Sequence, residues 1–477
     1  MRVLFAAAEV YPLAKTGGLA DVAAALPAAL RAQSVEIRVA MPAYRGVIAR
    51  VREPVCVGAL EVRGLRVELI GATHPDSGVP LLLLDAPALF DRPGSPYADE
   101  RGEPHPDNAL RFAIFCEAVA RIAIGDAGPQ LAADIVHLND WHTGLVPVYL
   151  AQGAARVRSL MTIHNLAYQG LFDHAQYRAL GLPDHLWHPG AAEFYGGFSF
   201  LKTGLQLADA LTTVSPTYAR EIQTPEFGER LDGVLRGRAG VLSGILNGID
   251  ETVWNPATDP LIDHPYDASS VVAGKRANRQ ALQRQLGLAA GDDPMLAFIG
   301  RLAQQKGADA LLAARDSLSA LPVQIVVLAS GDRALEQGFA QWAAQMPDRV
   351  AVSTAYDEAL AHRIEASADM LIMPSRFEPC GLNQMYSQRY GTIPLVRRVG
   401  GLADSVEDYR SARPTGIHFE NTDAGGVAYA VGKAVELWRQ PKLWHRMQAN
   451  GMACDWSWAR PAAQYLDIYR SLAGTGV

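Results

Sequence analysis

The chain alternates short apolar runs of strand length with longer helical stretches rich in Ala and Leu. The first half contains "RVLFAAA", "EIRVAMP", "VELIGAT", "PLLLLDA", "DIVHLND", "RSLMTIHN" and "ADALTTVS", with helical stretches such as "LADVAAALPAALRAQ" and "NALRFAIFCEAVARIA" between them. Such runs are typical of parallel strands that are buried on both faces and joined by helical crossovers. The sequence therefore predicts an α/β fold of doubly wound parallel sheets.

The alternation stops once and then restarts, which predicts two α/β domains. The break is "GILNGIDETVWNPATDP", a stretch rich in Asn, Asp, Gly and Pro that is typical of a hinge. The runs "MLAFIGRL", "VQIVVLAS", "RVAVSTAY", "DMLIMPS" and "TIPLVRR" follow it. We expect domains at residues 1–245 and 246–455, and a terminal helix at 456–477. That helix places Tyr465, Ile468 and Tyr469 on one face, and we expect it to pack back on the N-terminal domain.

Composition excludes several classes of partner. The formal net charge is −7, which argues against duplex nucleic acid or an anionic membrane as the main partner. The N-terminal apolar run is interrupted by Glu9 and is too short for a signal peptide or a membrane span. The four cysteines form no CxxC pair, so we expect a reducing compartment, the cytoplasm, and neither a disulfide framework nor a zinc site.

The pentapeptide GGLAD occurs twice, in "KTGGLADV" (15–22) and "VGGLADSV" (399–406). Paired glycines permit tight turns and close backbone approach, and a helix that begins there presents free amides to a phosphate. Lys15, beside Gly17 and Gly18, adds a cation to the first copy. The other reading is a strand–helix turn with a solvated lysine. The second copy permits the same turn and helix start, but no lysine adjoins its glycines.

Two segments of the second half carry charge directly after predicted strands. In "FIGRLAQQKG", Arg301 and Lys306 form a cation pair that suits a diphosphate, although a solvated basic helix start has the same pattern. In "PSRFEPCGLNQMYSQRYG", Glu378 begins a turn before a helix, where it binds a sugar or interacts with the helix N-terminus. The turn continues through Cys380 and Gly381, and the amides of Leu382 and Asn383 then begin the helix and are free to bind phosphate.

The first half supplies polar and aromatic residues at strand ends, where ligands bind in open parallel sheets. "HLNDWHTG" contains Asp140 and Trp141, and "TIHNLAYQG" contains His164. An aromatic ring beside a carboxylate is a common way to hold a sugar, although the same residues also make ordinary strand-end turns. The histidine spacings match no zinc motif, so we expect no metal.

Taken together, these segments resemble the bacterial glycogen synthases and plant starch synthases. The matching words are "EVYPLAKTGGLADV", "HLNDWHTGLVP", "TIHNLAYQG", "TPEFGERLDGVL", "GILNGID", "FIGRLAQQKG", "PSRFEPCGLNQMY" and "VRRVGGLADSV", in the family's order over nearly the whole chain. The resemblance implies a GT-B fold, two Rossmann-like domains facing a deep cleft. It also implies transfer of glucose from ADP-glucose to the non-reducing end of an α-1,4-glucan such as glycogen, with retention of configuration and without a cofactor.

The resemblance also implies a role for each matched residue. Lys15, Gly17 and Gly18 face the phosphates and the reacting sugar, and Asp140, His164 and Asn247 hold the glucosyl unit. Arg301 and Lys306 bind the diphosphate with the Leu382 and Asn383 amides, Tyr356 lies against adenine, and Glu378 binds the donor sugar. Weaker candidates for the acceptor chain are Glu9, Asp21, Tyr97 and Trp141. Tyr386 stands where many relatives with this fold carry a second glutamate, so the resemblance implies front-face attack rather than a two-carboxylate mechanism.

Three other functions fit parts of the pattern. A synthase of the same fold that uses UDP-glucose differs only in its donor. A phosphorylase needs a lysine for pyridoxal phosphate, which no motif marks. A non-catalytic glucan-binding or regulatory protein does not need Lys15, Arg301, Lys306 and Glu378, all of which are present.

Overall fold

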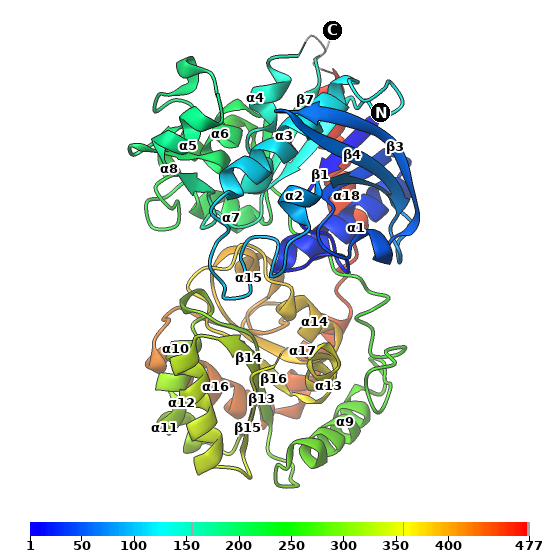
Figure 1. The fold of residues 1–477 in the computed structure, drawn as a ribbon. Helices are drawn as coiled ribbons and strands as arrows, with labels where there is room; N and C mark the ends of the chain where they lie inside the picture. Colours follow the sequence, from blue (N-terminus) through cyan, green and yellow to red (C-terminus); the bar gives the residue numbers. More distant parts are fainter. Residues whose placement is uncertain (154–155, 356, 475–477) are drawn as a thin grey trace. The chain divides into compact units, whose positions relative to one another are not determined.

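The computed structural model describes residues 1–153, 156–355 and 357–474, which form two compact units (Figure 1). Unit 1 comprises Met1–Asn247 together with Trp458–Val477, and unit 2 comprises Gly248–Ser457. Each unit is an α/β structure with its own sheet, so the fold class expected from the alternating runs is confirmed.

Unit 1 is built on a nine-stranded sheet in the order β12-β11-β7-β6-β1-β2-β5-β4-β3. The strands are β1 (Arg2–Ala6), β2 (Glu36–Pro42), β3 (Arg52–Val62), β4 (Leu65–Thr73), β5 (Pro80–Asp85), β6 (Ile135–Asn139), β7 (Arg158–Ile163), β11 (Ala210–Thr213) and β12 (Leu242–Gly244). The helices are α1 (Gly18–Ala32), α2 (Pro87–Phe90), α3 (Asn108–Ile124), α4 (Val146–Leu150), α5 (His174–Ala179), α6 (Phe200–Leu207), α7 (Pro216–Glu221), α8 (Asp232–Gly237) and α18 (Ala459–Gly474). A small antiparallel sheet adds β8 (Leu171–Phe172), β9 (Glu193–Phe194) and β10 (Gly197–Ser199).

One strand departs from the expected parallel arrangement. The run "VELIGAT" lies in β4, which pairs antiparallel with both β3 and β5. Arg63 and Gly64 have φ values of 52° and 75° between β3 and β4, and two such residues form the tight turn that favours a hairpin. The parallel expectation was therefore wrong at this edge, because the turn residues rather than the apolar run decide the pairing.

The C-terminal helix α18 belongs to unit 1 and packs against α1 and β6 (Figure 1). Tyr465 and Tyr469 are fully buried in the core of this unit. The Tyr469 hydroxyl lies 2.6 Å from Nδ1 of His137 on β6, and Nε2 of His137 lies 2.7 Å from the Thr162 hydroxyl. His137 therefore links α18 to the sheet through contacts at both of its ring nitrogens.

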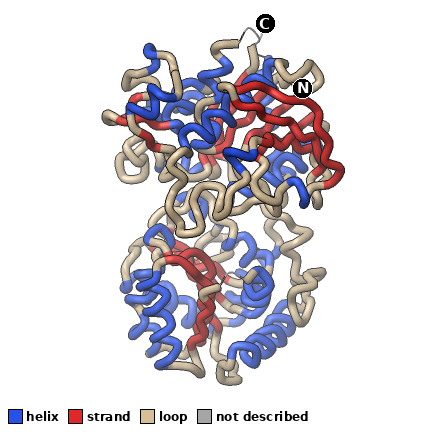
Figure 2. Tube along the Cα trace, in the orientation of Figure 1, coloured by secondary structure: helices blue, strands red, loops and turns tan. Residues whose placement is uncertain are grey.

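Unit 2 contains a six-stranded parallel sheet in the order β15-β14-β13-β16-β17-β18, with helices around it (Figure 2). The strands are β13 (Met295–Leu302), β14 (Gln324–Gly331), β15 (Val350–Ser353), β16 (Met370–Met373), β17 (Ile393–Arg397) and β18 (Ile417–Phe419). The helices are α9 (Val271–Leu286), α10 (Ala308–Ala313), α11 (Arg315–Ser319), α12 (Arg333–Gln345), α13 (Glu358–Ser367), α14 (Asn383–Arg389), α15 (Gly400–Ser405), α16 (Ala424–Trp438) and α17 (Pro441–Met452).

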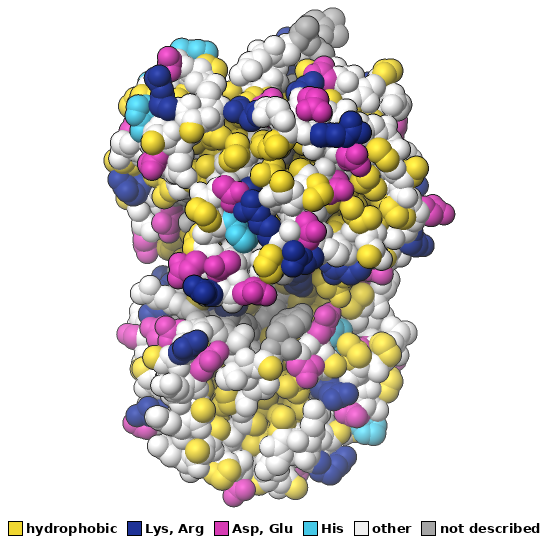
Figure 3. Space-filling view, in the orientation of Figure 1, with side chains coloured by type: hydrophobic (Ala, Val, Ile, Leu, Met, Phe, Trp, Pro, Cys, Tyr) yellow, Lys and Arg dark blue, Asp and Glu magenta, His cyan; other side chains and the backbone are white. Residues whose placement is uncertain are grey.

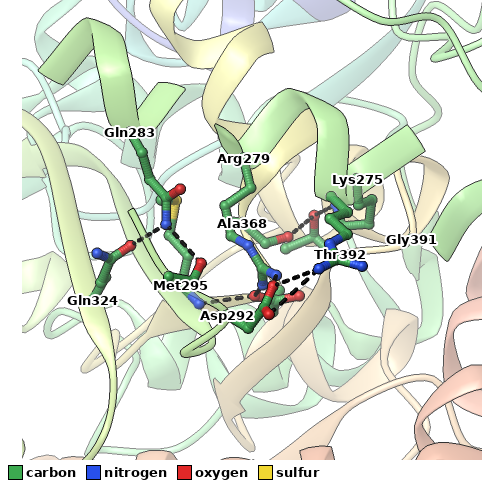
Figure 4. Close-up of polar contacts among 12 residues, drawn as sticks. Lys275, Arg279, Gln283, Asp292, Met295, Gln324, Ala368, Gly391 and Thr392 are labelled. Atoms are coloured by element: carbon green, nitrogen blue, oxygen red, sulfur yellow. Dashed lines mark hydrogen bonds and ion pairs between the residues drawn. The ribbon is translucent and has the colours of Figure 1, made fainter. Parts of the chain in front are cut away.

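Helix α9 buries a polar face instead of an apolar one (Figure 4). Lys275, Arg279 and Gln283 recur every four residues and point inward. The Lys275 ammonium donates to the Thr392 hydroxyl at 2.7 Å and to backbone carbonyl groups, while Arg279 pairs with Asp369 at 2.7 Å. Burial lowers the pKa of Lys275. Because a buried cation is costly without partners, these contacts determine where α9 docks.

Both sheets reverse their strand order at one point. In unit 1 the order runs from β1 to β2 in one direction and from β1 to β6 in the other, and in unit 2 β13 stands between β14 and β16 in the same way. Ligands of open α/β sheets bind beyond the carboxyl ends of the strands at such a switch point.

Surface charge and helix length and polarity limit the kinds of partner. On the face drawn in Figure 3, Lys and Arg are mixed with Asp and Glu over both units. In residues 1–153, 156–355 and 357–474, every helix is too short or too polar to pass through a bilayer.

Candidate active site

In unit 1 the first GGLAD loop follows β1 and begins α1, as the sequence predicted. The Lys15 ammonium lies 2.7 Å from the Asp21 carboxylate in the first turn of the helix. Gly17 has an extended φ of −156°, and a Cβ added to Gly17 or Gly18 would meet no described atom within 4 Å. Neither the φ of Gly17 nor the packing around the two glycines therefore requires glycine, and the open space is compatible with the predicted close approach of a ligand.

The Glu9 side chain supports this loop through hydrogen bonds. Its buried carboxylate accepts hydrogen bonds from the amide and hydroxyl of Thr16, from the Gly17 amide and from the Tyr97 hydroxyl. The carbonyl of Tyr97 accepts in turn from the Asn108 side chain at 2.9 Å. The carboxylate oxygens of Glu9 thus accept hydrogen bonds within the protein and support the loop, and contact of Glu9 and Tyr97 with the acceptor chain stays a prediction.

Asp140 follows β6 in a strained conformation. Its φ of 55° and ψ of −174° are in a region that is nearly restricted to glycine, at a cost of about 1–3 kcal/mol. The carboxylate is buried and accepts from the amide of His164 at 2.7 Å. Burial raises the pKa of Asp140 to about 7. The strained backbone, the raised pKa and the place at a switch point make Asp140 a candidate functional carboxyl group.

His164 follows β7, and its imidazole Nε2 lies 2.9 Å from Oδ1 of Asn139. Burial lowers the pKa of His164 to about 3, so the ring is neutral at physiological pH. Trp141 packs with its ring centroid 4.1 Å from that of His142 and lies against Gly170 so closely that a Cβ there would overlap it. Trp141 is therefore held partly buried beside Asp140.

Asn247 ends the first segment of unit 1 and is 6% exposed. Its side-chain Oδ1 is buried and accepts no hydrogen bond from any described residue. Buried polar atoms are nearly always satisfied, so this oxygen is suited to a ligand donor.

In unit 2 a cation and a carboxylate meet at the switch point. The Lys306 ammonium lies 2.6 Å from Oε2 of Glu378, which also accepts from the Ser375 hydroxyl at 3.0 Å. The Glu378 side chain is 6% exposed and that of Lys306 is 23% exposed. Arg301 lies exposed near the end of β13, with Nη2 3.5 Å from the Gln305 side chain. The structure thus joins two of the predicted residues directly.

The second GGLAD begins α15, again as predicted, and its glycines pack against the turn that carries Glu378. The Gly401 amide donates to the Glu378 carbonyl at 3.0 Å, and a Cβ on Gly401 would overlap the Cys380 carbonyl. Gly381 has a left-handed φ of 73° in the same turn. This copy of GGLAD therefore positions the Glu378 turn.

Leu382 is the N-cap residue of α14, and the Asn383 side chain donates to the Ile299 carbonyl of β13 at 2.9 Å. Asn383 thus ties the helix start to the neighbouring strand. Tyr386 stacks on Trp254 with centroids 3.8 Å apart. The candidate Tyr356 lies outside the described residues. Within the described ranges, no three side chains of His, Cys, Asp or Glu are grouped as metal ligands.

Two family models and several curated relatives match this chain. Residues 2–237 match the family model described as starch synthase catalytic domain, and residues 279–453 match the one described as glycosyl transferases group 1. Glycogen synthase 1 of Methylococcus capsulatus is 49% identical, over 99% of this chain and 97% of the relative. Glycogen synthase of Thioalkalivibrio sulfidiphilus is 47% identical, over 99% and 100%.

Among solved structures, the catalytic domain of starch synthase IV from Arabidopsis thaliana, bound to ADP and acarbose, matches with a TM-score of 0.88 and 32% identity. The match covers 99% of both chains. Sucrose-phosphate synthase from Thermosynechococcus elongatus, at 19% identity and a TM-score of 0.62, shares the fold. With full-length relatives at nearly half identity and both family models matched in order, the chain belongs to the glycogen synthase and starch synthase family.

Proposed function

We propose that this chain transfers glucose from ADP-glucose to the non-reducing end of an α-1,4-glucan and releases ADP. One observation carries the proposal. In both units, the residues implied by the family resemblance follow the strands that flank the switch point, Asp140 in unit 1 and Glu378 in unit 2. The Arabidopsis relative that shares this fold was solved with ADP and acarbose, which supports a nucleotide and a carbohydrate as ligands.

The donor diphosphate is assigned to unit 2. Arg301 grips phosphate oxygens with its guanidinium fork, and Lys306 adds a compact charge that stabilises ADP as the glycosidic bond breaks. The backbone amides of Leu382 and Asn383 are the remaining groups assigned to the diphosphate. Lys306 is paired with Glu378, so a bound diphosphate would share this cation with the Glu378 carboxylate.

The glucosyl unit is assigned to Asp140, His164, Asn247 and Glu378. The unsatisfied Oδ1 of Asn247 and the buried carboxyl of Asp140 accept from sugar hydroxyls. Gly17 and Gly18 allow the backbone to approach the phosphates, with Lys15 beside them. For the acceptor glucan, the candidates are Asp21, Trp141, Glu9 and Tyr97, and the hydrogen bonds of Glu9 and Tyr97 also shape the loop.

We propose that the configuration is retained through front-face attack, in which the departing phosphate oxygen takes the proton of the acceptor hydroxyl. The alternative double displacement needs a carboxylate nucleophile. The Glu378 carboxylate contacts the Lys306 ammonium and the Ser375 hydroxyl. Tyr386, which stacks on Trp254, occupies the position where many relatives with this fold carry a second glutamate.

The proposed partners are ADP-glucose and glycogen. The proposed compartment is the cytoplasm, because all four cysteines are free and Cys56 is exposed. The net charge of −7 supports the expectation that nucleic acid and anionic membranes are not partners.

A donor comparison tests the function. Purified enzyme is incubated with glycogen and radioactive ADP-glucose or UDP-glucose, and label in the polymer and release of the nucleoside diphosphate are both measured. We expect incorporation matched by ADP release. A preference for UDP-glucose would favour the related synthase, and glycogen binding without ADP release would favour a non-catalytic glucan-binding protein.

A further inference from the structure

We infer that Asn139, which no motif assigned to the site, is a positioning residue that fixes His164 in the tautomer with hydrogen on Nε2. Asn139 is the last residue of β6 and is fully buried. It lies at the switch point of unit 1, with β1 on one side and β7 on the other. The inference deepens the proposed function and rests on it where it concerns the reaction.

The orientation of the Asn139 amide follows from its neighbours. Nδ2 lies 3.0 Å from the carbonyl oxygen of Ala6 and 3.4 Å from that of His137. A carbonyl oxygen only accepts hydrogen bonds, so the NH₂ group of Asn139 must face this pair. Oδ1 is therefore the atom directed at the imidazole of His164, 2.9 Å from Nε2.

The tautomer of His164 follows from that orientation. Oδ1 of Asn139 only accepts, so Nε2 of His164 must donate and must carry a hydrogen. Since burial keeps the ring neutral, Nδ1 then carries a lone pair. No described residue donates to Nδ1, so it is the hydrogen-bond acceptor that the ring offers to a ligand.

His164 is held at both ends by consecutive residues. Asn139 holds the imidazole, and the Asp140 carboxylate accepts from the His164 amide at 2.7 Å. Asn139 ends β6 and Asp140 follows it, and both side chains contact the residue directly after β7. In the proposed reaction His164 thus accepts a hydrogen bond from a sugar hydroxyl and donates none through Nδ1.

Nitrogen NMR of isotope-labelled histidine in the ligand-free enzyme tests the tautomer directly. The His164 signals are assigned by their loss in His164→Gln. We expect a pyrrole-type resonance for Nε2 and a pyridine-type resonance for Nδ1. Hydrogen on Nδ1, or a protonated ring at pH 7, would overturn the inference, whatever the enzyme's activity.

Asn139→Leu keeps the size of the side chain but removes both polar atoms. We expect a mixed tautomer signal for His164 and a fall of about 10- to 100-fold in kcat/KM for ADP-glucose, by analogy with residues that orient metal-ligating histidines. Asn139→Asp keeps an acceptor but adds charge, so the pKa of His164 should rise and the acid limb of the pH profile should move upward. An unchanged His164 spectrum in both variants would refute the positioning role.

Asn278→Leu is the matched control. Asn278 is 1% exposed, donates to the carbonyls of His264 and Gly274, and accepts from the His264 amide, all within unit 2. The control should lower stability but leave the His164 spectrum and pH profile unchanged. Equal effects of both Leu variants would mean that Asn139 is only structural. A wild-type enzyme with the expected tautomer but no glucosyl transfer would refute the proposed function and leave the tautomer assignment standing.

Discussion

Replacing Lys306 with Met should separate the catalytic and structural roles of its pair with Glu378. Met keeps most of the aliphatic stem and removes the ammonium that lies 2.6 Å from the Glu378 carboxylate. We expect kcat to fall about 10²- to 10³-fold, as when other groups that stabilise developing charge are lost. ADP should also bind more weakly, and isothermal titration calorimetry measures that change.

The same variant should lose stability, because Glu378 is buried. After the substitution, the Glu378 carboxylate keeps the Ser375 hydroxyl as its side-chain donor. Breaking a fully buried ion pair costs about 3–5 kcal/mol, but the Lys306 side chain is 23% exposed and water replaces part of its charge. We therefore expect a loss of about 1–3 kcal/mol in the free energy of unfolding, measured by urea denaturation.

Lys433→Met is the control, because Lys433 has almost the same side-chain exposure, 24%, and a 2.5 Å contact with Glu436. Glu436 is 59% exposed, so this pair should contribute little to stability and nothing to activity. The double variant Lys306→Met/Glu378→Gln should recover stability without recovering kcat. The reasoning is refuted if Lys306→Met keeps kcat within about threefold of wild type, or if it is no less stable than Lys433→Met.

Three further perturbations test the geometry. Burial raises the pKa of Asp140 from 3.8 to about 7, so the contribution of its protonation to stability is complete below pH 3.8 and is lost as pH rises through 7. The stability of Asp140→Asn relative to wild type should therefore increase by about 2–3 kcal/mol as the pH is raised from 5 to 8, as measured by urea denaturation at each pH. The variant should also lose activity. Asp369→Asn leaves the buried Arg279 without its 2.7 Å partner and should cost about 3–5 kcal/mol, with hydrogen exchange locating the loss at α9. Gly401→Ala forces a Cβ into the carbonyl of the Glu378 turn and should lower kcat, whereas Gly237→Ala, with open space around it, should not.

The sequence could predict the strands and the strand-end residues because both depend on local pattern. Runs such as "EIRVAMP" and "MLAFIGRL" coincide with β2 and β13, and Asp140 and Glu378 follow strands as expected. The direction of β4 was not predictable from its apolar run, since a hairpin turn sets it. Nor was the role of Asn139, whose three polar partners come from three different strands or strand ends.

The two GGLAD copies show why identical words do not imply identical roles. Both begin a helix after a strand, which is the part of their behaviour that local chemistry dictates. Around Gly17 and Gly18 a Cβ would meet open space, whereas at Gly401 it would collide with the turn that carries Glu378. The first pair of glycines therefore leaves space beside the loop, and Gly401 of the second pair packs against the turn that carries Glu378. The residues packed around each loop, and not the pentapeptide itself, therefore decide whether the glycines leave space for a ligand or support a neighbouring turn.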